Sequence, residues 1–246
     1  MTSSQTKSDM FDFHTHILPK MDDGSSSVEE SIAMLHALKL QGVNYVAATP
    51  HFYADRMSPN SFFERRQAAW DRLKPHLSPE LPEIRLGAEI QYFEGINRYE
   101  GLERFCIDGT DLLLLEMPMG SWTTRMVSAL AEINARPNIT VLLAHIERYY
   151  REQSKATWDN LLKCGIQMQA SASFFISRSS RRLSMKLLRD GSIHVLGTDC
   201  HDSADRKPDM ADAVTVIERK KGSDLLQRID QRAHMYLQFH TGQRND

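Results

Sequence analysis

Cysteine, long apolar runs and an excess of charge of either sign are all scarce in this sequence. The 246 residues contain only Cys106, Cys164 and Cys200, an odd number with no close pairing. This argues against a disulfide scaffold and favours a reducing, cytoplasmic location. No apolar run approaches the ~20 residues that cross a bilayer, so no membrane insertion is expected. The polar start, residues 1–9, lacks the apolar core of a signal peptide and is predicted to be disordered.

Charge is almost balanced. The 30 lysines and arginines face 32 aspartates and glutamates, for a formal net charge of −2. No stripe of basic residues interrupts this balance, which argues against an electrostatically driven nucleic-acid partner. The sequence leaves the oligomeric state open.

Short apolar runs alternate with helical patterns along the chain. The pattern predicts strands at 11–13, 43–49, 83–90, 111–117, 139–145, 166–171 and 193–199. Helices are predicted near 25–42, 61–77, 122–135, 153–163, 180–190 and 209–219. The first should begin with a capping box, because Ser26 and Ser27 each precede a glutamate by three residues, and should stop at Gly42.

Such alternation indicates a parallel sheet covered by helices. The simplest closed form is an α/β barrel that resembles a (β/α)8 barrel with one unit missing, and an open doubly wound sheet is the alternative. We expect one domain over residues 10–222, followed at 223–246 by a helix and tail whose role the sequence leaves open.

The polar residues lie where the predicted strands end. Parallel strands of a barrel open onto one face, which is where active sites of such folds lie. His14 and His16 also share one side of a strand, because side chains alternate. Six of the seven strand ends deliver His, Asp or Glu, and the sixth strand delivers Ser171 and Ser173 instead. The polar strand-end residues are His14, His16, His51, Glu89, Glu116, His145, Arg148, Asp199 and His201.

With an aspartate from the pair after His16, the set offers more donors than one tetrahedral metal ion needs. It suits two or three cations bridged by carboxylates. The other histidines fall within helices, at a strand start or in the tail, and are interpreted as surface or core residues: His36, His76, His194, His234 and His240.

The ordered motifs "DFHTH", "DDG", "TPH", "GAEI", "AHIERY" and "TDCH" followed by R-x-P carry a family resemblance. Together they resemble the PHP superfamily, and more closely the bacterial manganese-dependent protein tyrosine phosphatases of capsule and exopolysaccharide operons. The resemblance covers residues 11–217, and it implies a distorted (β/α)7 TIM-like barrel of the PHP type.

The resemblance also implies a site with three manganese ions, with iron, cobalt or zinc as alternatives. One ion would lie among His14, His16, Glu89 and Asp199, and a second among Glu89, Glu116 and His145. The third would lie among Asp23, His51 and His201. Arg148 and Arg206 would contact the phosphate. The implied reaction is hydrolysis of phosphotyrosine by a metal-activated hydroxide, and the implied substrate is a bacterial tyrosine kinase with a tyrosine-rich tail.

Several alternatives remain at this stage. The same fold serves histidinol-phosphatase-like enzymes and phosphodiesterases, and a metal-stabilised interaction domain is a further, non-enzymatic reading. Cys200 and Arg206 have the Cys-x5-Arg spacing of thiol-dependent phosphatases, but Asp202 and Asp205 within that loop would repel a phosphate. Aromatic residues that could pack a phosphotyrosine ring, although core packing is the simpler interpretation, are Phe52, Tyr53, Phe174 and Phe175.

Overall fold

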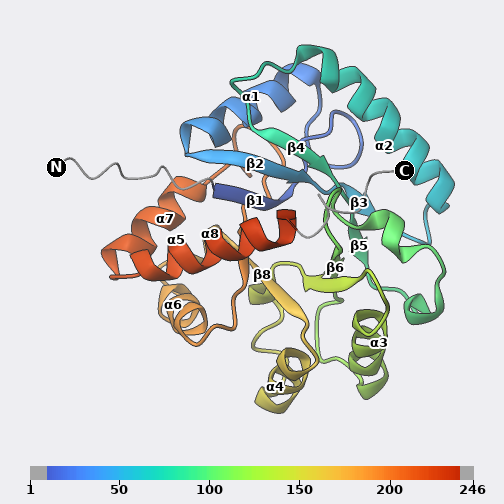
Figure 1. Ribbon diagram of the computed structural model, residues 1–246, viewed down its shortest axis with the longest axis vertical. Helices are drawn as coiled ribbons and strands as arrows, with labels where there is room; N and C mark the ends of the chain where they lie inside the picture. Colours follow the sequence, from blue (N-terminus) through green and yellow to red (C-terminus); the bar gives the residue numbers. More distant parts are fainter. Residues whose placement is uncertain (1–9, 239–246) are drawn as a thin grey trace.

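The computed structural model describes residues 10–238, and it has a curled parallel sheet surrounded by helices (Figure 1). The strands are β1 (Met10–Thr15), β2 (Val43–Ala48), β3 (His51–Phe52), β4 (Glu83–Leu86), β5 (Glu89–Gln91), β6 (Leu112–Glu116), β7 (Thr140–Leu143), β8 (Gln167–Ser171) and β9 (Val195–Gly197). The α-helices are α1 (Val28–Leu40), α2 (Pro59–Leu73), α3 (Thr124–Asn134), α4 (Lys155–Lys163), α5 (Ser173–Ile176), α6 (Arg181–Arg189), α7 (Met210–Arg219) and α8 (Ser223–Gln238). The predicted disorder of residues 1–9, the end of the predicted tail and His240 lie outside the described residues.

Two of the predicted strands are divided. The run 43–49 continues past Pro50 as β3, and the run 83–90 becomes β4 and β5. Proline has no N–H to donate, so the ladder is interrupted there. Backbone hydrogen bonds still join the two segments around this point. Gly87 N donates to Ala48 O at 2.9 Å, and Glu89 N donates to Pro50 O at 3.0 Å. A count of seven βα units is therefore not confirmed: one sheet has the order β1-β2-β4 and the other β3-β5-β6-β7-β8-β9.

The first and last strands meet beside this curled sheet. Thr15 pairs with Cys200 in an isolated parallel bridge. Backbone bonds flank it, from His16 N to Cys200 O at 2.9 Å and from Asp199 N to His14 O at 2.8 Å. The first and last histidine-bearing motifs are thus adjacent in space although they are almost 200 residues apart.

The start of α1 largely follows the predicted capping pattern. Ser27 Oγ accepts a bond from Glu30 N at 3.2 Å, as expected. In a full capping box the Glu30 side chain would accept from Ser27 N. Here Glu30 Oε2 instead accepts from the N and Oγ of Ser26, both at 2.7 Å. The helix ends before Gly42, whose φ of +85° is a left-handed conformation that glycine adopts at little cost.

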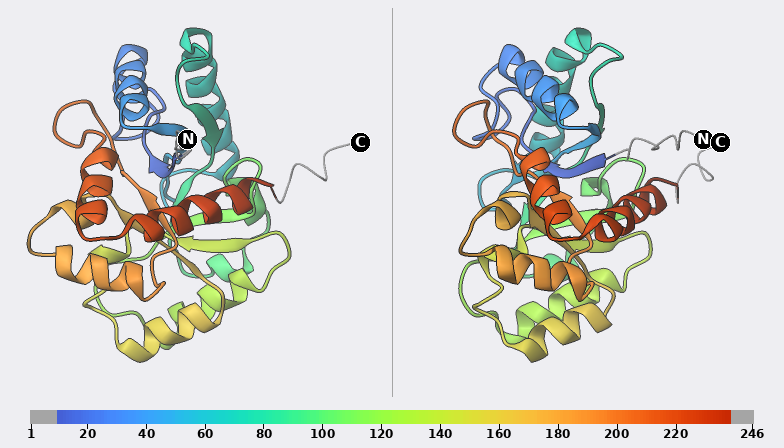
Figure 2. Two further views of the ribbon diagram at one scale, coloured as in Figure 1. Left: turned by 60° about the vertical axis from the view of Figure 1, so that its left-hand side comes forward. Right: turned by 90° about the vertical axis from the view of Figure 1, so that its left-hand side faces the viewer.

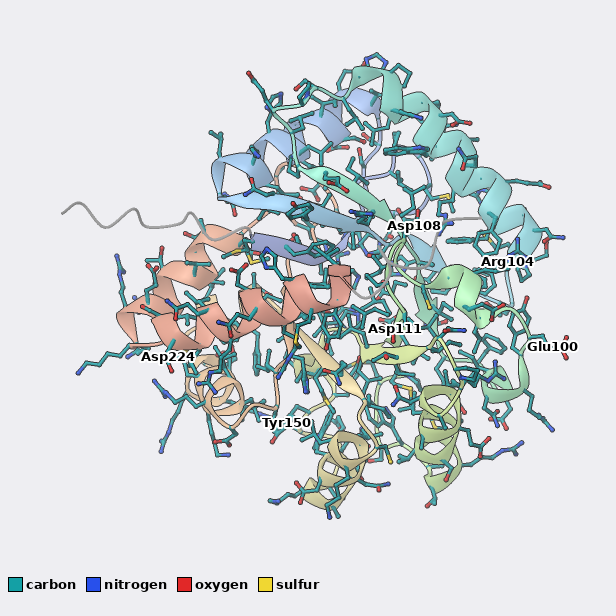
Figure 3. The ribbon with its side chains drawn as sticks, viewed as in Figure 1. Glu100, Arg104, Asp108, Asp111, Tyr150 and Asp224 are labelled. Carbon is teal, nitrogen blue, oxygen red and sulfur yellow. The ribbon has the colours of Figure 1, made fainter. Side chains whose placement is uncertain are left out.

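Helix α8 covers the end of the sheet at which the strands begin (Figures 1 and 2). Its Ala233, together with Tyr236, packs into a second core cluster that includes Phe13. The Tyr236 hydroxyl also donates to Gln167 Oε1 at 2.7 Å. Asp111, labelled in Figure 3, precedes β6 on this face and accepts from Thr140 Oγ1. The opposite end, where the strands finish, remains free to carry the site. Among residues 10–238, no helix combines the length and apolarity needed to cross a bilayer.

Candidate metal centre

A cavity of about 720 Å³ opens at the carboxyl ends of the strands. Its wall includes His51, Glu116, Arg148, Asp199 and Arg206. Asp199 and Arg206 both follow β9, and the other three come from β3, β6 and the turn after β7. The polar strand ends therefore converge as the sequence predicts, and the buried ligand candidates lie beneath this cavity.

His14 and His16 face each other at the end of β1. Both are fully buried, and their Nε2 atoms are 3.1 Å apart. The Nδ1 atom of His16 lies 2.7 Å from Asp22 Oδ2, and that of His14 lies 3.3 Å from Gln169 Oε1. These acceptors favour the tautomer with the proton on Nδ1, so each Nε2 presents a lone pair. Two lone pairs that converge in a buried space are the arrangement that a cation stabilises.

Glu89, at the start of β5, lies among four imidazoles. Its Oε1 is 2.8 Å from His145 Nε2, while Oε2 is 2.8 Å from His51 Nδ1 and 3.2 Å from His14 Nε2. His16 Nε2 is 3.5 Å from the same oxygen. Burial alone would raise the pKa of Glu89, but His14 and its neighbouring imidazoles hold it well below its usual value. The side chain is therefore a buried carboxylate that reaches two groups of donors.

Within residues 10–238, several nitrogen and oxygen atoms of this cluster are buried and form no hydrogen bond. They include Glu89 Oε2 and His51 Nδ1, which lie 2.8 Å apart without forming one, and His201 Nε2. His201 Nδ1 faces Asp199 O at 2.9 Å, which again leaves the lone pair on Nε2. A buried polar atom left unpaired costs about 1–3 kcal/mol. A divalent cation would satisfy all of them, so these residues fit the metal that the sequence predicts.

Three overlapping groups of donor atoms each lie within 4.8 Å. They are His14, His16 and Glu89; His51, Glu89 and Glu116; and His16, Asp23, His51 and His201. The other two expected ligands lie beside these groups. His145 Nε2 is 3.4 Å from Glu116 Oε1, and Asp199 Oδ1 is 3.4 Å from His14 Nε2.

All nine ligand residues expected from the sequence thus form one contiguous cluster. The groups differ from the expected sets at three positions, the first being Asp199, which is absent from the group of His14, His16 and Glu89. His16 lies with the Asp23 group as well as with the first set, and His51 lies beside Glu116, where the expected set has His145.

Backbone strain falls on two of the nine positions. His145 has φ +31° and Asp199 has φ +56°, which residues with a Cβ rarely adopt. Such conformations cost of order 1–3 kcal/mol and persist where the surrounding structure enforces them. Here the strained residues are those that turn a side chain into the cluster at the ends of β7 and β9.

Two glycines let the strands approach closely. A Cβ on Gly24, in the "DDG" motif, would lie 2.5 Å from His16 Cβ. A Cβ on Gly197, in β9, would lie 2.6 Å from His14 Cβ. Any larger residue would therefore displace one of the two histidines that face each other.

The sequence prediction missed the residues that orient the ligands. Asp22 Oδ2 accepts from His16 Nδ1 and, at 2.9 Å, from His51 N. Gln169 Oε1 accepts from His145 N at 2.6 Å and faces His14. The signals were present, because Asp22 adjoins Asp23 and Gln169 lies on β8 two residues before Ser171. Burial would raise the pKa of Asp22, but His16 lowers it well below its usual value.

Arg148 and Arg206 reach the cluster from the cavity. Arg148 donates to Asp199 Oδ2 at 2.6 Å and to Glu116 Oε1 at 3.2 Å. Arg206 donates to Asp199 Oδ2 at 3.0 Å. Their side chains are 38 % and 43 % exposed, so both guanidinium groups combine a fixed position with access to an anion that enters the cavity.

The Cys200 loop does not suit thiol chemistry. Cys200 is 1 % exposed, and burial, with nearby carboxylates, raises its pKa well above the usual range. A thiolate nucleophile needs the opposite shift. Asp202 Oδ1 also accepts from the amides of Ala204 and Asp205 at 2.6 Å and from Arg206 N at 3.1 Å. A carboxylate therefore occupies the amides that a phosphate cradle requires.

The residues set aside in the sequence lie away from the cluster. His36 and His76 are exposed, His194 Nδ1 accepts from Met168 N at 3.0 Å, and His234 bonds within α8. Phe52, Phe174 and Phe175 are core residues, as the simpler interpretation holds. Tyr53 differs, because it lines the cavity and stacks on His51 with ring centroids 5.1 Å apart.

Comparison with known proteins identifies the family. The family described as "Capsular polysaccharide synthesis, CpsB/CapC" matches residues 10–237. The chain belongs to this family. The match includes all nine clustered residues and both arginines, so the CpsB/CapC region contains the whole candidate site.

Relatives resemble the CpsB/CapC chain over nearly its full length. Tyrosine-protein phosphatase YwqE of Bacillus subtilis strain 168 is 26 % identical over 238 residues, covering 94 % of this chain and 93 % of YwqE. Tyrosine-protein phosphatase CpsB of Streptococcus pneumoniae is 27 % identical over 231 residues, covering 87 % of this chain and 92 % of CpsB. A solved structure from work on YwqE and CpsB, described there as metal-dependent tyrosine phosphatases, superposes with a TM-score of 0.80 at 24 % identity, covering 93 % and 94 % of the two chains. The last comparison shows that the fold is shared.

Proposed function

We propose that this protein is a metal-dependent phosphomonoesterase that hydrolyses phosphotyrosine in proteins. The observation that carries the proposal is the buried cluster of imidazoles and carboxylates around Glu89, with two arginines on the cavity above it. Membership of the CpsB/CapC family and the names of its relatives support phosphotyrosine as the substrate.

The proposed cofactor is a set of three manganese ions, with iron, cobalt or zinc as alternatives. The donors are imidazole nitrogens and carboxylate oxygens, which suit such divalent ions and offer no thiolate that would select softer ones. The residues that would hold the ions are His14, His16, Asp23, His51, Glu89, Glu116, His145, Asp199 and His201. When bound, close divalent cations supply a nucleophile at neutral pH and neutralise phosphoryl charge.

The residues of the chain itself account for binding and orientation. In this proposal, Arg148 and Arg206 donate paired N–H groups to the equatorial oxygens of a phosphate. Tyr53 is placed on the cavity wall to contact the ring of a phosphotyrosine. Asp22 fixes the ring of His16 through its Nδ1. Because phenolate is a far better leaving group than an alkoxide, the proposal requires no general acid.

The proposed substrate is a cytoplasmic bacterial tyrosine kinase with a tyrosine-rich tail that controls capsule or exopolysaccharide synthesis. The support is the capsular polysaccharide synthesis family to which the chain belongs. A cavity open at the strand ends also allows a side chain carried by another protein to enter.

A substrate panel tests the proposal. One preparation with its metal content measured would be assayed with a phosphotyrosine peptide, histidinol phosphate and a phosphodiester. We expect kcat/KM to be highest for the phosphotyrosine peptide. A higher value for histidinol phosphate or for the diester would contradict the proposed substrate, and absence of hydrolysis with bound metal would favour the interaction-domain alternative.

A further inference from the structure

A groove of about 430 Å³ lies beside the main cavity, and the two share part of their walls. Glu147 and Ser173 line both. The two spaces therefore adjoin at the edge of the candidate site, and the groove lies between that site and α6. A free phosphotyrosine needs only the main cavity, whereas a peptide also needs room for its flanking residues.

The groove wall carries one acid, Glu147, and one base, Arg151. Arg151 is exposed on its wall, and within residues 10–238 its guanidinium has neither an ion pair nor a hydrogen bond. Glu147, the acid on the same wall, already uses both carboxylate oxygens on Ser171 N at 3.3 Å. The bordering segment 171–183 contains three arginines and no acidic residue. An acidic group entering the groove could therefore pair with the guanidinium of Arg151, while the carboxylate of Glu147 is directed to Ser171 N.

The loop that carries Arg151 is fixed in place. Its neighbour Tyr150, labelled in Figure 3, stacks on Trp158 of α4 with ring centroids 5.1 Å apart. The carbonyl of Tyr150 also accepts from Trp158 Nε1 at 3.1 Å. Phe174 and Leu183 also line the groove, although Phe174 is largely buried. A positioned cation beside apolar lining is a combination that distinguishes one peptide sequence from another.

We propose that this groove binds the polypeptide that flanks the phosphotyrosine, and that Arg151 pairs with a carboxylate side chain in that flanking segment. The inference rests on the proposed function and deepens it, because it assigns a sequence preference to the substrate. The preferred substrate is then a phosphotyrosine with aspartate or glutamate nearby in the chain.

Two phosphotyrosine peptides that differ only in flanking glutamates or lysines would test the groove. The wild-type protein should prefer the glutamate peptide by up to about fivefold in kcat/KM, as expected for one exposed ion pair. Arg151→Ala should bring the ratio close to one, and Arg151→Glu should invert it. Arg219→Ala is the matched control, because Arg219 is also exposed but lies at the far end of α7, and it should keep the wild-type ratio.

Free O-phosphotyrosine turnover by each variant reports whether the reaction site is folded, and therefore separates the groove from the hydrolase. Equal turnover of the two peptides by the wild type, or an unchanged ratio in Arg151→Ala, would overturn the proposal. An equal effect of Arg219→Ala would also overturn it, because the preference would then come from overall charge. If no phosphotyrosine is hydrolysed, the proposed function fails. The groove is then tested separately, by comparing the affinities of the wild type and the variants for non-hydrolysable phosphonate versions of the glutamate and lysine peptides.

Discussion

Replacing Glu89 by glutamine should weaken metal binding at the centre of the cluster. The carboxylate lies within 3.5 Å of nitrogen atoms of His14, His16, His51 and His145, and it is fully buried. Glutamine preserves the shape but removes the negative charge and one of the two acceptor oxygens. Because the two oxygens face different histidines, a single substitution should weaken the binding of more than one ion.

The expected size follows from binding linkage. An ion at 1,000 times its Kd stabilises the folded state by about 4 kcal/mol. In a chain of this length, 1 kcal/mol corresponds to ~2–4 °C in Tm. Manganese at that excess should therefore raise the Tm of the wild-type protein by about 8–16 °C for one ion. The Glu89→Gln variant should lose most of this increase, bind fewer ions and lose phosphotyrosine hydrolysis.

The assay compares Tm with and without manganese, and bound metal per chain, for the wild type, Glu89→Gln and Glu64→Gln. Glu64 is exposed on α2, so its variant makes the same chemical change without touching the cluster. Cooperative unfolding of metal-free Glu89→Gln would show that the fold survives. An unchanged metal stoichiometry and an unchanged manganese-dependent Tm in Glu89→Gln would refute the reasoning, and retained activity would refute the central role of the carboxylate.

Three further predictions concern other parts of the molecule. Arg148→Ala and Arg206→Ala should keep their metal but lose about ten- to a hundredfold in kcat/KM, because each charge-assisted contact contributes ~1.5–3 kcal/mol. Wild-type kinetics in both variants would show that neither arginine contacts the phosphate. Cys200→Ser should keep most of its activity whereas His201→Ala, one residue along, should lose it; the reverse result would restore the thiol mechanism. Burial lowers the pKa of His194 from 6.5 to about 4, so the unfolded chain binds more protons between these values and stability falls as the pH drops through this window. The loss amounts to about 3 kcal/mol by pH 4, and His194→Asn should flatten this pH dependence in denaturant titrations; an unchanged slope would show that His194 is not its source.

Much of the site was predictable because a parallel sheet places all of its strand ends on one face. Strand periodicity located His14 and His16, and the ordered motifs located Asp199 and His201 about 185 residues later. The sequence could not show that the strands break at Pro50 and after Leu86, because local pattern does not report where a curled ladder loses its register.

The orienting residues were harder to identify for a different reason. Asp22 and Gln169 act through hydrogen bonds whose partners lie far away along the chain, and their residue types are common in loops and strands. The sequence also could not show that Glu30 Oε2 accepts from Ser26 N rather than from Ser27 N, because this choice depends on one local rotamer. The sequence predicted a helix after residue 223 but left its role open, and only the folded chain reveals that Phe13 packs against Tyr236.

The central claim is that the buried cluster holds the metal on which phosphotyrosine hydrolysis depends. Its most direct test measures phosphotyrosine-peptide turnover by one preparation before chelation, after chelation and dialysis, and after addition of manganese. We expect chelation to abolish turnover and manganese to restore it in proportion to the metal bound per chain. Full turnover by the protein from which the metal has been removed would contradict the account.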